Sequence, residues 1–205
     1  NNAGKFTDIT AALGLDAHTG WWNSVTLGDL DSDGRLDLVA GNWGLNSKYQ
    51  QSYSREKPLR ITYGDFDKNG VLDIVEYHFD KQTGKMVPER GRSCTSRAMD
   101  FIGKSNPTYN VFGSRSLEEI YGACIKEGTV VEANTLAHMV FLNRGDKFEG
   151  RPMPKEAQFA PVFGVNVADF DGDGNEDVFV AQNFFASQIE TPRSDGGRGL
   201  LMLGD

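Results

Sequence analysis

Residues 29–37 read DLDSDGRLD, and the same pattern returns as DFDKNGVLD at residues 65–73 and as DFDGDGNED at residues 169–177. Each copy has Asp at positions 1, 3 and 9, Asp or Asn at position 5, and Gly at position 6. A nonapeptide that occurs three times in 205 residues indicates an internal repeat rather than a chance cluster of acids.

Short segments rich in β-branched and aromatic residues lie on both sides of each acidic nonapeptide. Such segments favour β-strands, whereas the Gly, Asp and Asn residues between them favour a turn. The strands expected from this pattern are residues 24–27, 36–40, 59–63, 72–77, 162–167 and 178–181. Hairpins that recur along a chain are typical of a β-propeller, so we predict an all-β fold that is a propeller or a block of its blades.

The acidic turns carry the donors that a hard cation prefers. Carboxylates at positions 1, 3 and 5 repel one another unless a cation lies among them, and Ca²⁺ favours several oxygen ligands. Gly at position 6 permits a positive φ, so that the carbonyl at position 7 and the acid at position 9 complete the cage. Mg²⁺ suits such a cage less because it keeps its waters, and Zn²⁺ prefers the His and Cys ligands that these turns lack.

About three Ca²⁺ sites are therefore expected. The predicted side-chain ligands are Asp29, Asp31, Asp33 and Asp37 in the first loop, Asp65, Asp67, Asn69 and Asp73 in the second, and Asp169, Asp171, Asp173 and Asp177 in the third. The predicted carbonyl ligands are those of Arg35, Val71 and Asn175.

The nearest competing interpretation is an EF-hand, whose loop shares the first six positions and requires Glu at position 12. Position 12 is Ala40 in the first loop, Glu76 in the second and Val180 in the third, so only the second loop meets the requirement. Its flanking residues favour strands rather than helices. A second alternative is a set of solvated Asx-turns, but ordinary turns do not need four acidic or amide positions in fixed register.

Charge and hydropathy bear on the class of partner. The chain has 21 Lys and Arg residues against 29 Asp and Glu residues, a formal net charge of −8, which argues against nucleic acid because a phosphate backbone binds to basic surfaces. The apolar runs are too short to span a bilayer. No catalytic motif is evident, and His18, His78 and His138 are too scattered to form a ligand set. We therefore predict no catalytic residues.

Residues 81–135 differ in texture from the repeats and are expected to form an insert within a single domain of residues 1–205. Ser116 and Glu119 fit a capping box, which predicts a short helix that ends at Gly122. The two cysteines of the chain lie in this segment. They either form a disulfide in an oxidising compartment or remain two buried thiols.

Two other motifs have simpler interpretations than a binding site. Arg144-Gly145-Asp146 lies where a hairpin between residues 139–143 and 148–151 needs a turn, which explains the tripeptide without an integrin partner. Trp21, Trp22 and Trp43 are interpreted as packing beside a repeat turn rather than as a sugar-stacking platform.

The acidic turns resemble the FG-GAP, or VCBS, repeats of integrin α-chain propellers and of bacterial secreted proteins that often carry an ASPIC/UnbV domain. Four further segments are similar to the bacterial branch: GWWNSV at residues 20–25, GNWGLNS at 41–47, SLEEIYG at 116–122 and GLLMLGD at 199–205. The resemblance implies calcium-loop propeller blades, an exported protein and no established catalytic residues. Asn69 departs from the usual Asp and leaves the second loop one charge poorer.

These observations predict a calcium-stabilised binding or scaffolding module that is secreted, periplasmic or on the cell surface, with a protein or glycan ligand. The alternative is a polysaccharide lyase or hydrolase on the same kind of propeller. Residues 200–205 followed by residues 1–7 would read as one repeat hairpin. The chain is thus expected to be either a small ring closed by its termini or a segment whose partners include the remaining blades of a larger chain.

Overall fold

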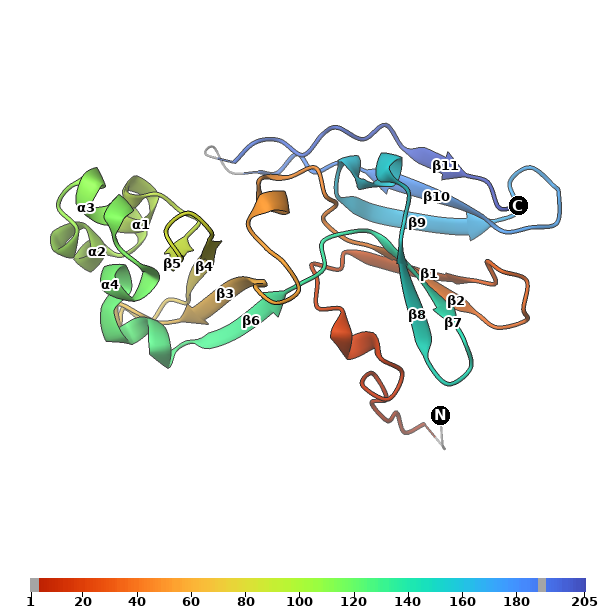
Figure 1. The fold of residues 1–205 in the computed structure, drawn as a ribbon, viewed down its shortest axis with the longest axis horizontal. Coiled ribbons are helices and arrows are strands. Elements are labelled where there is room, and N and C mark those ends of the chain that lie inside the picture. Colours follow the sequence, from red (N-terminus) through yellow and green to blue (C-terminus); the bar gives the residue numbers. More distant parts are fainter. Residues whose placement is uncertain (1–3, 188–190) are drawn as a thin grey trace. The chain divides into compact units, whose positions relative to one another are not determined.

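A computed structural model describes residues 4–187 and 191–205 and divides the chain into two compact units. Residues 1–50 and 135–205 form one unit, which we call the split unit, and residues 51–134 form the continuous unit. The described strands make three antiparallel sheets, two in the split unit and one in the continuous unit (Figure 1). Each predicted strand–turn–strand repeat forms a hairpin in a different sheet, so all six predicted strands are confirmed.

The split unit contains a four-stranded sheet of order β1-β2-β7-β8 and a three-stranded sheet of order β11-β10-β9. β1 lies beside β9, so the two sheets are neighbours (Figure 1). Its strands are β1 (Ser24–Gly28), β2 (Asp37–Gly41), β7 (Met139–Asn143), β8 (Phe148–Pro152), β9 (Val162–Ala168), β10 (Asp177–Gln182) and β11 (Leu200–Met202). Short 3-10 helices are η1 (Leu15–Ala17), η2 (Lys48–Gln51) and η4 (Lys155–Phe159).

The core of the split unit lies between its two sheets. Val39 of β2, Val162 of β9 and Val180 of β10 are completely buried and belong to one hydrophobic cluster. Because alternate residues of a strand point to opposite faces, the apolar runs after the acidic turns bury one face of each hairpin. The first and third acidic turns are thereby held at one end of a packed pair of sheets (Figure 1).

The first sheet is completed by residues distant in sequence. β7 pairs with β2 in the register Leu38↔Phe141, although the continuous unit lies between these strands in the chain. β7 and β8 form the hairpin predicted around the Arg-Gly-Asp tripeptide: Arg144 N–H donates to the Lys147 carbonyl at 2.8 Å, and Gly145 has φ 89°. The tripeptide is thus part of a turn.

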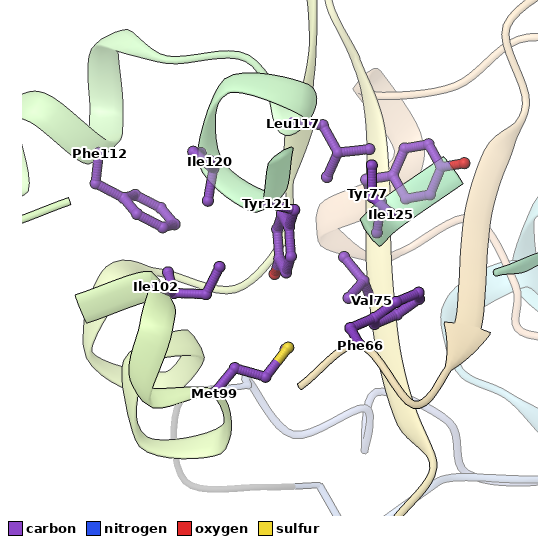
Figure 2. Close-up of a cluster of buried hydrophobic side chains, with 10 residues drawn as sticks. All are labelled: Phe66, Val75, Tyr77, Met99, Ile102, Phe112, Leu117, Ile120, Tyr121 and Ile125. Carbon is purple, nitrogen blue, oxygen red and sulfur yellow. The ribbon is translucent and has the colours of Figure 1, made fainter. Parts of the chain in front are cut away.

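The continuous unit contains a sheet of order β5-β4-β3-β6 with helices packed against it. Its strands are β3 (Leu59–Gly64), β4 (Asp73–Asp80), β5 (Lys85–Pro88) and β6 (Thr129–Ala133). Its helices are α1 (Arg92–Ala98), α2 (Asp100–Ser105), α3 (Tyr109–Ser114) and α4 (Leu117–Tyr121), followed by the 3-10 helix η3 (Gly122–Glu127). Figure 2 shows Ile102, Phe112 and Ile120 from the helices converging with Val75 and Tyr77 of β4.

The predicted helix after Ser116 is confirmed, with both hydrogen bonds of the capping box and with Gly122 at φ 72° after its end. The other three helices were not predicted, because their sequences are short and α1 and α2 begin without a side-chain cap. Cys94 and Cys124 are not joined by a disulfide and are half-buried, so the thiol alternative describes this structure except that neither side chain is fully buried. The fold is β-rich and antiparallel as expected, whereas closure into a propeller ring remains a prediction.

Candidate metal centres

The first Asp of each acidic loop organises the turn in the same way. In the first loop, Asp29 accepts hydrogen bonds from the backbone amides of Asp33 and Gly34, both at 2.9 Å. The corresponding bonds are those from Asn69 and Gly70 to Asp65, at 3.0 and 2.9 Å, and those from Asp173 and Gly174 to Asp169, at 3.2 and 3.0 Å. Three separate segments therefore adopt one local structure.

Two positions of each loop have a left-handed backbone. The Gly at position 6 has a φ of 82°, 83° or 95° in the three loops, as predicted from its conformational freedom. Position 4 is also left-handed: Ser32 has φ 55°, Lys68 has φ 59° and Gly172 has φ 82°. The left-handed backbone at position 4 could not be predicted from the sequence, because only the third loop has Gly there.

The ninth residue connects each loop to its own first turn and, in the split unit, to the third strand of the sheet. Asp37 is completely buried and accepts from the Leu30 amide at 3.0 Å and from the Asn143 amide, at the end of β7, at 2.7 Å. Asp177 accepts in the same way from Phe170 at 2.7 Å and from Gly204 at 2.8 Å. These two backbone donors stabilise the carboxylate and lower the pKa of Asp177.

The structure brings three carboxylates together in every loop, with ligand atoms within 4.8 Å of one another. The groups are Asp29, Asp31 and Asp33; Asp65, Asp67 and Asp73; and Asp169, Asp171 and Asp177. The other predicted side-chain ligands, Asp37, Asn69 and Asp173, lie in the same turns and accept from backbone amides. The role of the carbonyls of Arg35, Val71 and Asn175 remains a prediction.

The donor set fits a hard divalent cation, because each group consists of carboxylate oxygens on a turn that needs no His or Cys. The second loop replaces one carboxylate by an amide, and Asn69 Nδ2 donates to Asp67 Oδ2 at 3.0 Å. The third loop has a similar bond, from Asn175 Nδ2 to Asp173 Oδ2 at 3.1 Å, so the amide at position 5 is what distinguishes the second loop. The second loop therefore carries less charge to be neutralised than the third.

The first loop differs from the others because two guanidinium groups lie on its carboxylates. Arg144, from the turn between β7 and β8, contacts Asp31 at 2.5 Å and Asp33 at 3.8 Å, and Arg35 pairs with Asp33. The hydrogen bond from Arg144 lowers the pKa of Asp31. Among residues 4–187 and 191–205, no ion pair joins a Lys or Arg to the three clustered carboxylates of the second or the third loop.

The first and third loops are linked directly. The carboxylate of Glu176, at position 8 of the third loop, accepts a hydrogen bond from the Asp29 amide. A Cβ atom at Gly28 would collide with this carboxylate and with the Val167 side chain. Gly28 is thus required by close packing between two hairpins, a role that the local sequence does not reveal.

Residues 1–40 match the family model of the FG-GAP-like repeat. This match is consistent with an FG-GAP repeat protein. The matched FG-GAP-like repeat includes β1, the first acidic loop and most of β2, so the family pattern coincides with the first candidate metal centre. No curated protein and no solved structure matches the chain. The relation to the ASPIC/UnbV branch remains a prediction.

The remaining candidate residues have structural roles. Trp21 packs edge-to-face against Trp43 and Tyr49, with ring centroids 5.5 and 5.0 Å apart, which agrees with packing rather than an open platform. His138 is completely buried, and burial lowers its pKa to about 4. In the described part of the chain, no helix is both long and apolar enough to cross a bilayer.

Proposed function

We propose that this protein is a calcium-stabilised, propeller-type module that binds or scaffolds a protein or glycan partner outside the cytoplasm. The observation that carries the proposal is the common hydrogen-bond network of the three acidic loops, each with three carboxylates within 4.8 Å. The FG-GAP-like repeat supports a propeller-like binding or scaffolding role, and such repeats are typically extracellular.

Each position of the loop has a separate role in the proposed site. The Asp at position 1 accepts hydrogen bonds from backbone amides of its own turn, and the Asp at position 9 accepts one from the backbone of a neighbouring strand. Asp171, at position 3 of the third loop, is exposed and offers one carboxylate oxygen as a ligand atom. Bound Ca²⁺ would supply the positive charge that offsets repulsion among these carboxylates.

The calcium proposal is tested by titration calorimetry together with thermal melting in excess Ca²⁺ and in excess EGTA. Because the ion binds the folded chain and not the unfolded one, Ca²⁺ at 100 times its Kd stabilises the fold by about 2.7 kcal/mol per site. Asp171→Ala should remove one binding event, whereas Asp146→Asn, in an exposed turn outside the loops, should remove none. No heat of binding together with an unchanged melting curve would refute calcium binding.

The binding role is tested separately by exposing the immobilised chain, in Ca²⁺, to arrays of glycans and of extracellular proteins. Retention of a ligand in Ca²⁺ and its release in EGTA are expected. Polysaccharides that contain the arrayed glycans are then incubated with the chain in solution and assayed for new reducing ends and unsaturated products. Product formation would favour the lyase or hydrolase alternative and overturn a purely binding role.

A further inference from the structure

The helical part of the continuous unit carries a local excess of positive charge. Residues 90–126, which include α1 to α4, contain six Lys and Arg against three Asp and Glu, although the chain as a whole has a formal net charge of −8. Each of the three acids forms an ion pair with a lysine: Asp100 with Lys104, Glu118 with Lys126, and Glu119 with Lys85. The acids of this segment therefore do not neutralise its arginines.

Two of these arginines are fixed to one residue, Asn106. Arg92, the first residue of α1, donates from Nε to the Asn106 carbonyl at 2.6 Å and from Nη2 to the Gly103 carbonyl at 3.4 Å. Arg115, which follows α3, donates from Nη1 to Asn106 Oδ1 at 2.8 Å and to the Ser105 carbonyl at 2.9 Å. The two guanidinium groups are therefore close together, although 23 residues separate them in the chain.

Asn106 is a rigid base for both guanidinium groups. It is completely buried, and its Nδ2 donates to the carbonyls of Ile102 at 3.0 Å and Ile120 at 3.4 Å. Ile102 and Ile120 belong to the hydrophobic cluster of the continuous unit (Figure 2). Because the packed core fixes their acceptors, the guanidinium groups lose little conformational freedom when a further ligand binds.

The hydrogen bonds of Arg92 and Arg115 orient these side chains without neutralising their charge. Their acceptors are carbonyl oxygens at the end of α2, which need donors but carry no formal charge. Within residues 4–187 and 191–205, no ion pair joins either arginine to a carboxylate. Both side chains are half-buried, and a guanidinium has five N–H donors, so donors remain for a ligand.

An exposed aromatic ring adjoins the two arginines. Tyr109, the first residue of α3, is 68% exposed, and the guanidinium carbon of Arg92 lies 5.5 Å from its ring centroid. Cation–π attraction favours this arrangement and helps to hold Arg92 in place. The rest of the Tyr109 ring offers a flat apolar surface to a ligand, at a low cost in side-chain entropy.

We propose that Arg92, Arg115 and Tyr109 bind an acidic sugar residue. Its sulfate or carboxylate group would lie on the two guanidinium groups, and its ring would pack against Tyr109. Guanidinium N–H groups match the oxygens of both anions, and such charge-assisted hydrogen bonds are stronger than neutral ones. The exposed ring beside the charges favours an acidic glycan over an acidic peptide, which needs the charges alone. This inference rests on the proposed function, within which it specifies the class of glycan.

Titration calorimetry with short oligosaccharides tests the proposal, in saturating Ca²⁺ and in about 0.15 M NaCl to screen long-range attraction. The probes are a sulfated chondroitin tetrasaccharide, the same tetrasaccharide without sulfate, and neutral maltotetraose. At least the sulfated probe should bind the wild-type chain, and maltotetraose should not. Binding of the sulfated probe alone would identify sulfate as the recognised group, whereas binding of both acidic probes would show that a carboxylate suffices.

Three variants locate the site. Arg115→Gln should weaken binding by about tenfold or more, because hydrogen bonds to a charged group are lost. Tyr109→Ala should weaken it by about threefold through the lost ring contact, and its exposed position keeps folding intact. Arg97→Gln is the matched control, since it removes the same charge from an exposed position in the last turn of α1 and should leave the affinity nearly unchanged. Far-ultraviolet circular dichroism establishes that each variant is folded.

Several outcomes would overturn the proposal. They are failure of both acidic probes to bind, equal binding of maltotetraose, equal losses in Arg97→Gln and Arg115→Gln, and full affinity of Tyr109→Ala. A short polyglutamate peptide that binds more tightly than the acidic sugars would assign the site to a protein partner and overturn the sugar assignment. Calcium binding and retention on the arrays are measured separately, so failure of this site is distinguishable from failure of the proposed function.

Discussion

Lowering the pH from 7 to 5 should destabilise this protein by about 2 kcal/mol through His138 alone. His138 is completely buried; its Nδ1 accepts from the Asn42 amide at 2.8 Å. Nε2 must then carry the hydrogen and donates to the Ala160 carbonyl at 3.0 Å. A second proton on Nδ1 would face the Asn42 N–H and break this bond, so the folded protein holds the neutral ring.

The sign and magnitude follow from linkage. Burial lowers the pKa of His138 from 6.5 to about 4, so the unfolded chain takes up a proton below pH 6.5 while the folded chain does not. The stability that depends on the neutral ring is therefore present above pH 6.5. It is lost as the pH falls toward 4, at about 1.4 kcal/mol for each pH unit in the middle of this range.

Urea unfolding at pH 7, 6, 5.5 and 5, in saturating Ca²⁺, measures this slope. His138→Gln retains a donor and an acceptor but does not titrate, so its free energy of unfolding should change less with pH than that of the wild type. His18→Gln is the matched control. Because it retains His138, its free energy of unfolding should still show the pH dependence that His138 causes in the wild type. Equal slopes for the wild type and His138→Gln would refute the argument, whatever the absolute stability of the variant.

Two further substitutions test local features. Arg144→Gln should strengthen calcium binding by the first loop, because it removes a guanidinium 2.5 Å from Asp31. Titration calorimetry measures the affinity of that loop alone when the chain also carries Asp67→Asn and Asp171→Asn. The control is Arg151→Gln, which loses only a Glu149 contact, and an Arg144→Gln affinity no higher than that of this control would contradict the expectation. Ser116→Ala removes the N-cap of α4 and should lower the free energy of unfolding, measured by urea titration, by about 1 kcal/mol. Ser114→Ala, outside the cap, should lower it less. Equal losses of stability in the two variants would exclude the capping role.

Local chemistry was readable from the sequence wherever a few neighbouring residues determine the backbone. The acidic nonapeptides predicted three turns and the six strands around them, and Ser116 with Glu119 predicted a helix that the structure contains. The cause is that turns and caps are made by side chains that bond to amides two to five residues away. The three carboxylates gathered in each loop follow from the same short-range geometry.

Long-range packing, in contrast, was decided only by the tertiary structure. Nothing near β2 indicates that β7 will pair with it, and nothing near Asp31 indicates that Arg144 will contact it. Gly28 packs closely against Val167 and Glu176 of another hairpin, and helices α1 and α2 begin without the side-chain cap that α4 has. Such contacts depend on how whole sheets and helices bury their apolar faces. That choice is made by the sum of many weak contacts and leaves no short sequence pattern.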